Sequence, residues 1–459
     1  MEQNKMATKP MFPLLMSMAF PPMLSMLIQS LYNIVDSMFV AKYSQDALTA
    51  VSLAFPIQNL IIAVAVGTGV GINSFIARKL GEKQFHEANN AVTHGILLSI
   101  FHSLLFVIFG FLFIPSFFRA FTNSPSIFKL GCNYTYIIVF FCFSCQIHVA
   151  IEKILQATGQ MIFPMIFQAI GAIINIILDP IMIFGLFGFP KLGIEGAAIA
   201  TIIGQFSAMA LSVFVLLFQK HDVKPIIKGF QFHKDIIKQI YVVGFPSILM
   251  NSIGSILVMG LNGILIAFSE IAVSIFGIYF KLQSFIFMPI GGLIQGAMPI
   301  MGYNYGAKNH DRLLSALKNS LKVSLFIMTI GTILFCTFPK QCLLLFDATP
   351  EMLSIGILTL RIISVSYIPA AITFIFATLF QAIGKGFYSL VIFLLRQLVI
   401  TLPVAFILSK PFGLTGVWLS FPIAEIISVF VSLILFFIVY KKDPIFQKKK
   451  SSLETTLNN

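Results

Sequence analysis

Two hydrophobic runs contain acidic side chains that could bind a cation or carry a proton. Asp36 lies in the middle of LYNIVDSMFVA, and Asn175 and Asp179 lie within IINIILDPIMIF. A charged side chain at bilayer depth is strongly unfavourable, so an ionisable residue in such a run is by default a candidate functional residue. The chemistry expected of these residues is reversible protonation, or coordination of Na⁺ by carboxylate and amide oxygens.

Helical spacing places further polar side chains beside these acids. Residues three and four apart share one face of a helix. Four polar stripes follow: Gln29, Tyr32 and Asp36; Asn175 and Asp179; His148, Glu152 and Gln156; Thr201 and Gln205. We expect these stripes to converge inside one helical bundle. Neighbouring carboxylates in a low dielectric do not readily both ionise, so one should carry a proton. The same oxygens suit Na⁺, and the residues do not separate the two ions.

A structural role is the alternative for each of these side chains. Polar groups in membrane helices also hydrogen-bond across helices and hold them together. This interpretation competes for Asp36 and Asp179. It also applies to Glu152, which lies nearer a helix end, and to His148.

The second half of the chain also has charged residues within its predicted apolar segments. They are Lys281, Arg361, Arg396 and Glu425. We expect Arg396 or Arg361 to form a buried structural pair with Glu425. The alternative is that these residues, with Gln29 and Gln205 from the first half, shape a substrate cavity or its gate.

The composition is that of an integral membrane protein. Of 459 residues, 58% are hydrophobic and 10% are charged, whereas soluble domains have about 25% charged residues. The length suffices for roughly a dozen helices of ~20 residues each. Five scattered cysteines indicate no disulfide framework. No nucleotide motif, nucleophile elbow or metal-ligand spacing is present, so no cofactor is expected beyond a coupling ion, H⁺ or Na⁺.

Basic residues in the loops predict the orientation and account for the net charge of +13 without nucleic acid. Twelve apolar segments are predicted, at 13–40, 49–76, 92–116, 131–155, 162–187, 194–218, 239–268, 272–302, 315–338, 353–380, 386–410 and 413–440. Most Lys and Arg residues lie in the tails and in loops on the side of both termini. The positive-inside rule therefore predicts two cytoplasmic termini in a cell (inner) membrane.

The chain contains an internal duplication. The two halves align when the chain is shifted by a constant number of residues, the separation of Gly71 from Gly296. This alignment, called the long register below, also pairs Gly81 with Gly306 and Gln156-Ala-Thr-Gly159 with Gln381-Ala-Ile-Gly384. Further along, a loop of the second copy is shorter, and a short register aligns Gly193 with Gly413. A repeat of six helices re-enters from the same side, so the copies are parallel. We predict an N-lobe (1–218), a cytoplasmic linker (219–238), a C-lobe (239–440) and a basic tail (441–459).

The duplication separates shared scaffold from specialised residues. The long register places Leu261 opposite Asp36, Ala377 opposite Glu152, Ile400 opposite Asn175 and Val404 opposite Asp179. The acids of the first half therefore have no counterpart in the second. We expect their function to be local to the N-lobe.

With these motifs the chain resembles the multidrug and toxic compound extrusion (MATE) family, over essentially its whole length. The segments that carry the resemblance are GVGINSFIARKLGE, LQATGQ, NIILDPIMIFG and GIEGAAIAT. The likeness is strongest to the bacterial branch that includes the MepA and DinF exporters. It implies an all-α polytopic protein of twelve transmembrane helices, in two parallel six-helix repeats that form a V-shaped two-lobe transporter.

The resemblance also implies site residues. In this branch the ion site uses an Asp on helix 1 and an Asn-x-x-x-Asp on helix 5, which match Asp36 and Asn175–Asp179. Tyr32, Glu152 and Thr201 match polar residues near that site. The other large branch places acids in the C-lobe, where this chain lacks them. The basic C-lobe residues match no family motif, and they argue against a cavity lined only for cations.

The leading hypothesis is an antiporter that exports small lipophilic cations by alternating access, in exchange for H⁺ or Na⁺, as a single copy in the bilayer. The alternative is a related flippase or exporter of lipid-linked or anionic cargo, with the C-lobe basic residues as its substrate contacts. A membrane enzyme would need catalytic residues clustered at an interface loop. The sequence shows no such cluster.

Overall fold

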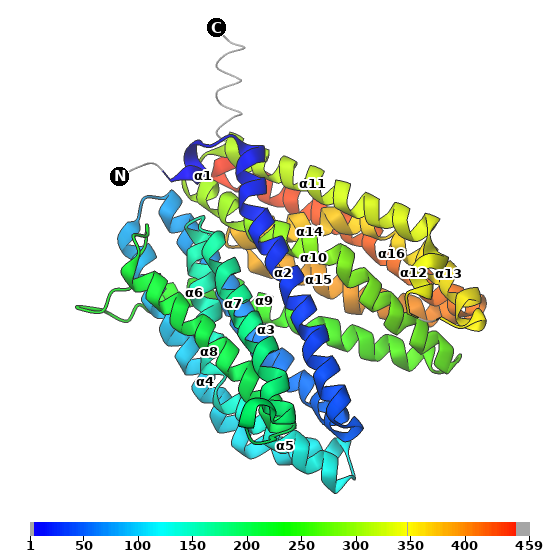
Figure 1. Cartoon of the computed structure of the whole chain (residues 1–459). Helices are drawn as coiled ribbons and strands as arrows, with labels where there is room; N and C mark the ends of the chain where they lie inside the picture. Colours follow the sequence, from blue (N-terminus) through cyan, green and yellow to red (C-terminus); the bar gives the residue numbers. More distant parts are fainter. Residues whose placement is uncertain (1–3, 347, 447–459) are drawn as a thin grey trace. The chain divides into compact units, whose positions relative to one another are not determined.

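The computed structural model describes residues 4–346 and 348–446, and within these ranges every regular element is helical (Figure 1). Lipid offers no partner for backbone N–H and C=O groups, so an apolar chain of this kind satisfies them within helices. The elements are α1 (Lys5–Thr8), α2 (Met11–Tyr43), α3 (Gln45–Gly81), α4 (Phe85–Phe121), α5 (Pro125–Phe140), α6 (Phe143–Ala157), α7 (Ile162–Phe184), η1 (Leu186–Gly188), α8 (Ile194–Phe218), α9 (Lys234–Leu265), α10 (Glu270–Gly306), α11 (His310–Thr337), α12 (Pro339–Leu344), α13 (Pro350–Ser364), α14 (Tyr367–Ala382), α15 (Gly386–Leu394), η2 (Leu395–Thr401) and α16 (Leu402–Lys442).

The helices of the described residues give the twelve predicted spans. Nine are long and apolar enough to cross a membrane alone, counting Gly386–Lys442 once. Two bent pairs, α5 with α6 at 45° and α13 with α14 at 44°, each make one more. The 57 residues of Gly386–Lys442 would extend about 85 Å as one helix, against a hydrocarbon core of ~30 Å. The break at Gly413, where φ is 58° and ψ is −139°, divides it into two spans.

The backbone confirms the internal duplication. Non-glycine residues with positive φ are uncommon, yet Lys83 and Lys308 both have it. Three equivalent pairs share positive φ values: Lys83 (61°) with Lys308 (54°), Gly159 (88°) with Gly384 (81°), and Gly193 (59°) with Gly413 (58°). The long register predicts the first two pairs, and the short register predicts the third. The two halves are therefore copies of one helical scaffold.

The chain divides into two compact units that exchange their first helical segments. The N-unit comprises Leu24–Leu80 and Gln84–Ile248, and the C-unit comprises the chain up to Met23, Gly81–Lys83 and the chain from Leu249. The first part of α2 thus belongs to the C-unit, and the first part of α9 belongs to the N-unit. The two switch points, after Met23 and after Ile248, are equivalent positions in the long register. Both halves therefore contribute the first part of their leading helix to the opposite unit in the same way.

Glycines in equivalent positions permit the close helix contacts of each unit. In the N-unit, a Cβ on Gly71 would overlap the carbonyl oxygen of Ile240. In the C-unit, a Cβ on Gly296 would overlap the backbone of Ala19. The glycine run around Gly71 therefore serves close helix packing, as small residues do in membrane bundles.

The segment between the two halves is bound to α4. The Thr93 hydroxyl donates to the carbonyl oxygen of Ile226 at 3.1 Å and accepts from its N–H at 2.8 Å. Nε2 of His94 accepts from the His233 N–H at 2.9 Å, and the His94 ring packs on Phe230. The connection is thus part of the N-unit.

We predict that Thr93→Val loosens this segment. The substitution removes two hydrogen bonds of about 1 kcal/mol each, so tryptic cleavage after exposed Lys228 should accelerate about tenfold or more. Mass spectrometry of the time course in detergent measures the rate. Thr93→Ser keeps the hydroxyl and should cleave like the wild type. Equal rates in all three proteins would contradict the prediction.

Candidate functional site

The scaffold of the site is the contact between α7 and α8, which run side by side in the N-unit (Figure 1). Gly204 of α8 lies against Gly171 of α7, where a Cβ would meet the Gly171 carbonyl oxygen. This close approach brings the α8 backbone to Asn175. One turn further along α7 lies Asp179, and both side chains are buried, with 2% and 0% exposure.

Asp36 of α2 and Asp179 of α7 meet at this position. Their carboxyl groups lie close together. Ionised carboxylates only accept hydrogen bonds, so a bond between the two would form only when one of them takes up a proton. The Asn175 side-chain N–H₂ donates to Asp179 Oδ1 and to Thr201 Oγ1, both at 3.3 Å, and the Tyr32 hydroxyl lies near Thr201. Three of the predicted stripes therefore converge here.

Three oxygens of this cluster lack a donor. They are Asp36 Oδ1, Asn175 Oδ1 and Asp179 Oδ2, each buried from solvent. A buried acceptor without a partner costs about 1–3 kcal/mol. A proton or a small hard cation at this point would satisfy them. Over the ranges that the structure describes, no three His, Cys, Asp or Glu side chains are grouped for a metal ion, so the donor set rests on amide and hydroxyl oxygens beside the two acids.

Two further residues belong to this neighbourhood and were missed from the sequence. Gln58 of α3 donates to the Tyr134 hydroxyl of α5 at 2.8 Å. Tyr134 is buried and lies within electrostatic reach of Asp36, Tyr32 and Asp179. Comparison of the two halves could have identified Tyr134, because the long register places a threonine opposite it and an unshared polar residue is a candidate for a specialised role. It could not have identified Gln58, which has a glutamine at the equivalent position.

Glu152 lies in a second, separate cluster. Lys153 Nζ is 3.0 Å from its Oε1, Gln156 donates to Oε1 at 2.9 Å, and Gln168 donates to Oε2 at 2.8 Å. Gln168 precedes Asp179 by three turns of α7, which is about 16 Å along the helix. The fourth predicted stripe therefore does not join the acid pair.

Lys153 is the group that sequence reasoning overlooked in this cluster. Its side chain is buried, at 6% exposure, and it directly follows Glu152 in an apolar helix, which was the available signal. It also hydrogen-bonds Gln156 at 3.0 Å, and His148 lies 4.0 Å from Glu152. The buried positive charge of Lys153 and the buried negative charge of Glu152 therefore neutralise one another.

The remaining candidates fall in different places. Gln29 and Lys281 are exposed, and Gln205 accepts a hydrogen bond from Ser144 at 3.4 Å. Arg361 donates from Nε to the carbonyl oxygen of Cys336 at 3.1 Å. Of the two arginines considered for Glu425, it is Arg396 that forms the ion pair.

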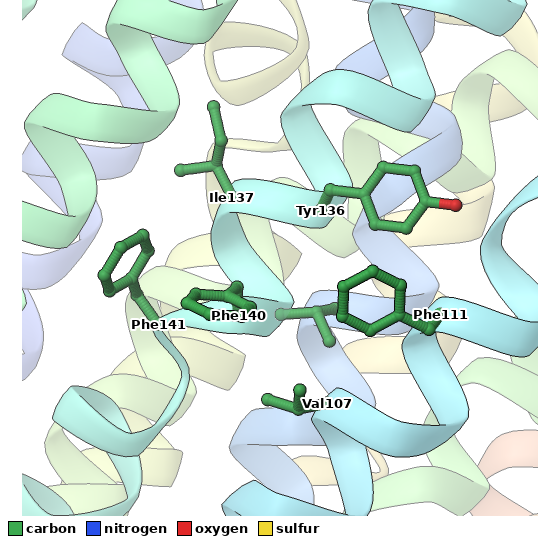
Figure 2. Close-up of a pocket in the computed structure, with 7 residues that line it drawn as sticks. Val107, Phe111, Tyr136, Ile137, Phe140 and Phe141 are labelled. Atoms are coloured by element: carbon green, nitrogen blue, oxygen red, sulfur yellow. The ribbon is translucent and has the colours of Figure 1, made fainter.

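A separate apolar pocket of about 300 Å³ lies between α4 and α5. Figure 2 shows the side chains that line it, with the Tyr136 ring beside Phe111. The lining residues are Val107, Phe111, Tyr136, Ile137, Val139, Phe140 and Phe141. None of them is a predicted site residue. This pocket therefore offers space for hydrocarbon and lacks the polar groups of the acid pair.

Known proteins resemble this chain over most of its length. The MatE family model matches residues 21–181 and 246–407, two stretches that begin at equivalent positions of the long register. The FAD transporter of Shewanella oneidensis is 26% identical over 435 residues, covering 93% of this chain and 94% of that protein. The multidrug export protein MepA of Staphylococcus aureus is 26% identical, covering 94% of each chain.

Solved structures match the fold over nearly the full length. An outward-facing multidrug resistance MATE transporter of the MOP superfamily aligns with a TM-score of 0.89 and 27% identity, over 95% of this chain and 97% of that one. A MATE protein in a bent conformation aligns with a TM-score of 0.90 and 26% identity, over 100% of both chains.

We predict that Lys153→Met destabilises the protein by about 3–5 kcal/mol, because it leaves the Glu152 carboxylate buried and unpaired. The melting temperature in detergent should fall accordingly. The double variant Glu152→Gln with Lys153→Met removes both charges and should recover most of the loss. A single variant as stable as the wild type would contradict the proposed pairing.

Proposed function

Because the chain belongs to the multidrug and toxic compound extrusion family, we propose that it exports lipophilic cationic compounds in exchange for H⁺ or Na⁺, by alternating access. The protein is a multi-pass membrane protein of a family of transporters, with small molecules as substrates. We propose in addition that the coupling ion is H⁺ or Na⁺, that the substrate is a cation, and that both act at the same site.

The buried oxygens without a donor around Asp36 and Asp179 support this proposal most directly. An ion that enters there supplies the missing partner, and it leaves the oxygens unsatisfied when it departs. A ligand shifts a conformational equilibrium only through different affinities for the two states. The bound ion would favour one arrangement of the transporter and the bound cation the other, since both neutralise the same carboxylates.

The roles of the surrounding residues follow from their contacts. Asn175 and Thr201 would orient Asp179 through the shared amide, and Tyr32 would hold Thr201. Glu152 would act as a second acid, whose protonation releases Lys153 from the ion pair. Both termini would be cytoplasmic, with one copy per functional transporter.

Export of anionic cargo is a second candidate. A relative as similar as MepA is named an FAD transporter, and FAD is an anion at neutral pH. The buried Arg396 would suit such cargo. This candidate predicts transport that depends on Arg396.

We predict that Asp36→Asn and Asp179→Asn each lower gradient-driven efflux of a fluorescent lipophilic cation from proteoliposomes at least tenfold. The reason is that an amide neither takes up a proton nor carries the charge that holds the cation. Separate pH and Na⁺ gradients identify the coupling ion.

Ser37→Ala is the matched control, since Ser37 neighbours Asp36 on α2 and its exposed hydroxyl bonds its own helix. It should transport like the wild type. Undiminished efflux in both acid variants would remove the acid pair from the mechanism.

A further inference from the structure

A second polar centre lies in the C-unit, where a helix departs from α-helical geometry. Residues Leu395–Thr401 form a π-helix, η2, between α15 and α16. The Thr401 hydroxyl donates to the carbonyl oxygen of Arg396 within it. Short π-helical segments inside α-helices occur frequently at functional sites. Arg396 is the second residue of this one.

The Arg396 guanidinium is held on one edge and on its faces. Nε pairs with Oε1 of Glu425 from α16. The guanidinium carbon lies 4.5 Å from the ring centre of Phe374 and 5.5 Å from that of Phe393. Both charged side chains are largely buried, at 11% exposure for Arg396 and 7% for Glu425. The group is therefore positioned before any ligand arrives.

The pair leaves hydrogen-bonding capacity unused. Nη1 of Arg396 and Oε2 of Glu425 are both buried without a partner. Arginine–carboxylate pairs are often bidentate, with two parallel N–H···O bonds, but here Glu425 engages the Nε edge. The pair therefore keeps one donor, Nη1, and one acceptor, Oε2, that a bound compound could engage. A pair kept for structure alone is expected to be fully satisfied.

The duplication indicates that this centre is specialised. The long register places Arg396 opposite Gly171, which in the N-unit lies against the α8 backbone. The short register places Glu425 opposite Gln205. The scaffold therefore does not require an ion pair at this point, because the first half has none at the equivalent positions.

We propose that Arg396 and Glu425 form a binding site for amphoteric aromatic compounds that carry a carboxylate and N–H groups. The carboxylate accepts from Nη1 of Arg396, and an N–H of the same compound donates to Oε2 of Glu425. The two phenylalanine rings keep the guanidinium plane fixed. This inference rests on the proposed export function and extends its substrates beyond simple cations.

The test compares two dyes that differ in one group. Rhodamine 110 has a free carboxylate and amino groups, and rhodamine 123 is its methyl ester. The double variant Arg396→Met with Glu425→Leu replaces the ion pair by apolar side chains, a change that buried pairs often tolerate. In proteoliposomes it should lose efflux of rhodamine 110 about tenfold or more, as the loss of a charged hydrogen bond predicts, and keep efflux of rhodamine 123 within about twofold.

The outcomes separate this proposal from the export function. Asp36→Asn should lose both dyes, and a wild type that exports neither would overturn the export function and this site with it. Wild-type export of rhodamine 123 alone, or equal export of both dyes by the double variant, would overturn only the Arg396 site and leave a structural pair.

A binding measurement covers the case in which the double variant does not fold. Arg396→Lys keeps the charge and loses Nη1 and the planar fork. Fluorescence polarisation in detergent should show weaker binding of rhodamine 110, by about tenfold, with rhodamine 123 unchanged. Equal affinity of the variant and the wild type for rhodamine 110 would overturn the proposal.

Discussion

A charged or unpaired polar group is stable inside a bilayer only where another group compensates it. The buried polar residues of the chain differ in how many hydrogen-bond or ion-pair partners they have. Glu152 is fully compensated by Lys153, Gln156 and Gln168. The acid pair of Asp36 and Asp179 is left with oxygens that lack a donor. A protein can carry such a deficit where an ion comes and goes, so we expect the acid pair to be the site that binds the coupling ion.

The duplicated scaffold explains how such a centre can be placed. Equivalent residues share positive φ values, as Gly193 and Gly413 do, and equivalent glycines pack against the first segment of the other half's leading helix. The scaffold is therefore set by small residues and turns present in both halves. The charged groups are not shared. Each half has its own buried centre, two acids in one and an arginine–glutamate pair in the other.

The helices, their number, the repeat and the meeting of three polar stripes were predictable, because hydrophobic length and helical periodicity are local properties of the chain. The surroundings of Glu152 were not. Its contact with Gln168 depends on how α6 packs on α7, and the role of Lys153 depends on that contact. Tyr134 and the exchange of helical segments between units were missed for the same reason, since periodicity assigns a face to a residue and not a neighbour.

In the proposed mechanism the acid pair of Asp36 and Asp179 binds an ion that the substrate displaces. The most direct measurement is ion release when tetraphenylphosphonium binds to the purified protein in weakly buffered detergent, followed with a pH indicator and, in parallel, with ²²Na⁺. We predict that substrate binding releases one of the two ions from the wild type, and that Asp36→Asn abolishes the release. Substrate binding that releases neither ion, or that releases as much ion from the variant as from the wild type, would show that the acid pair is not the site of exchange.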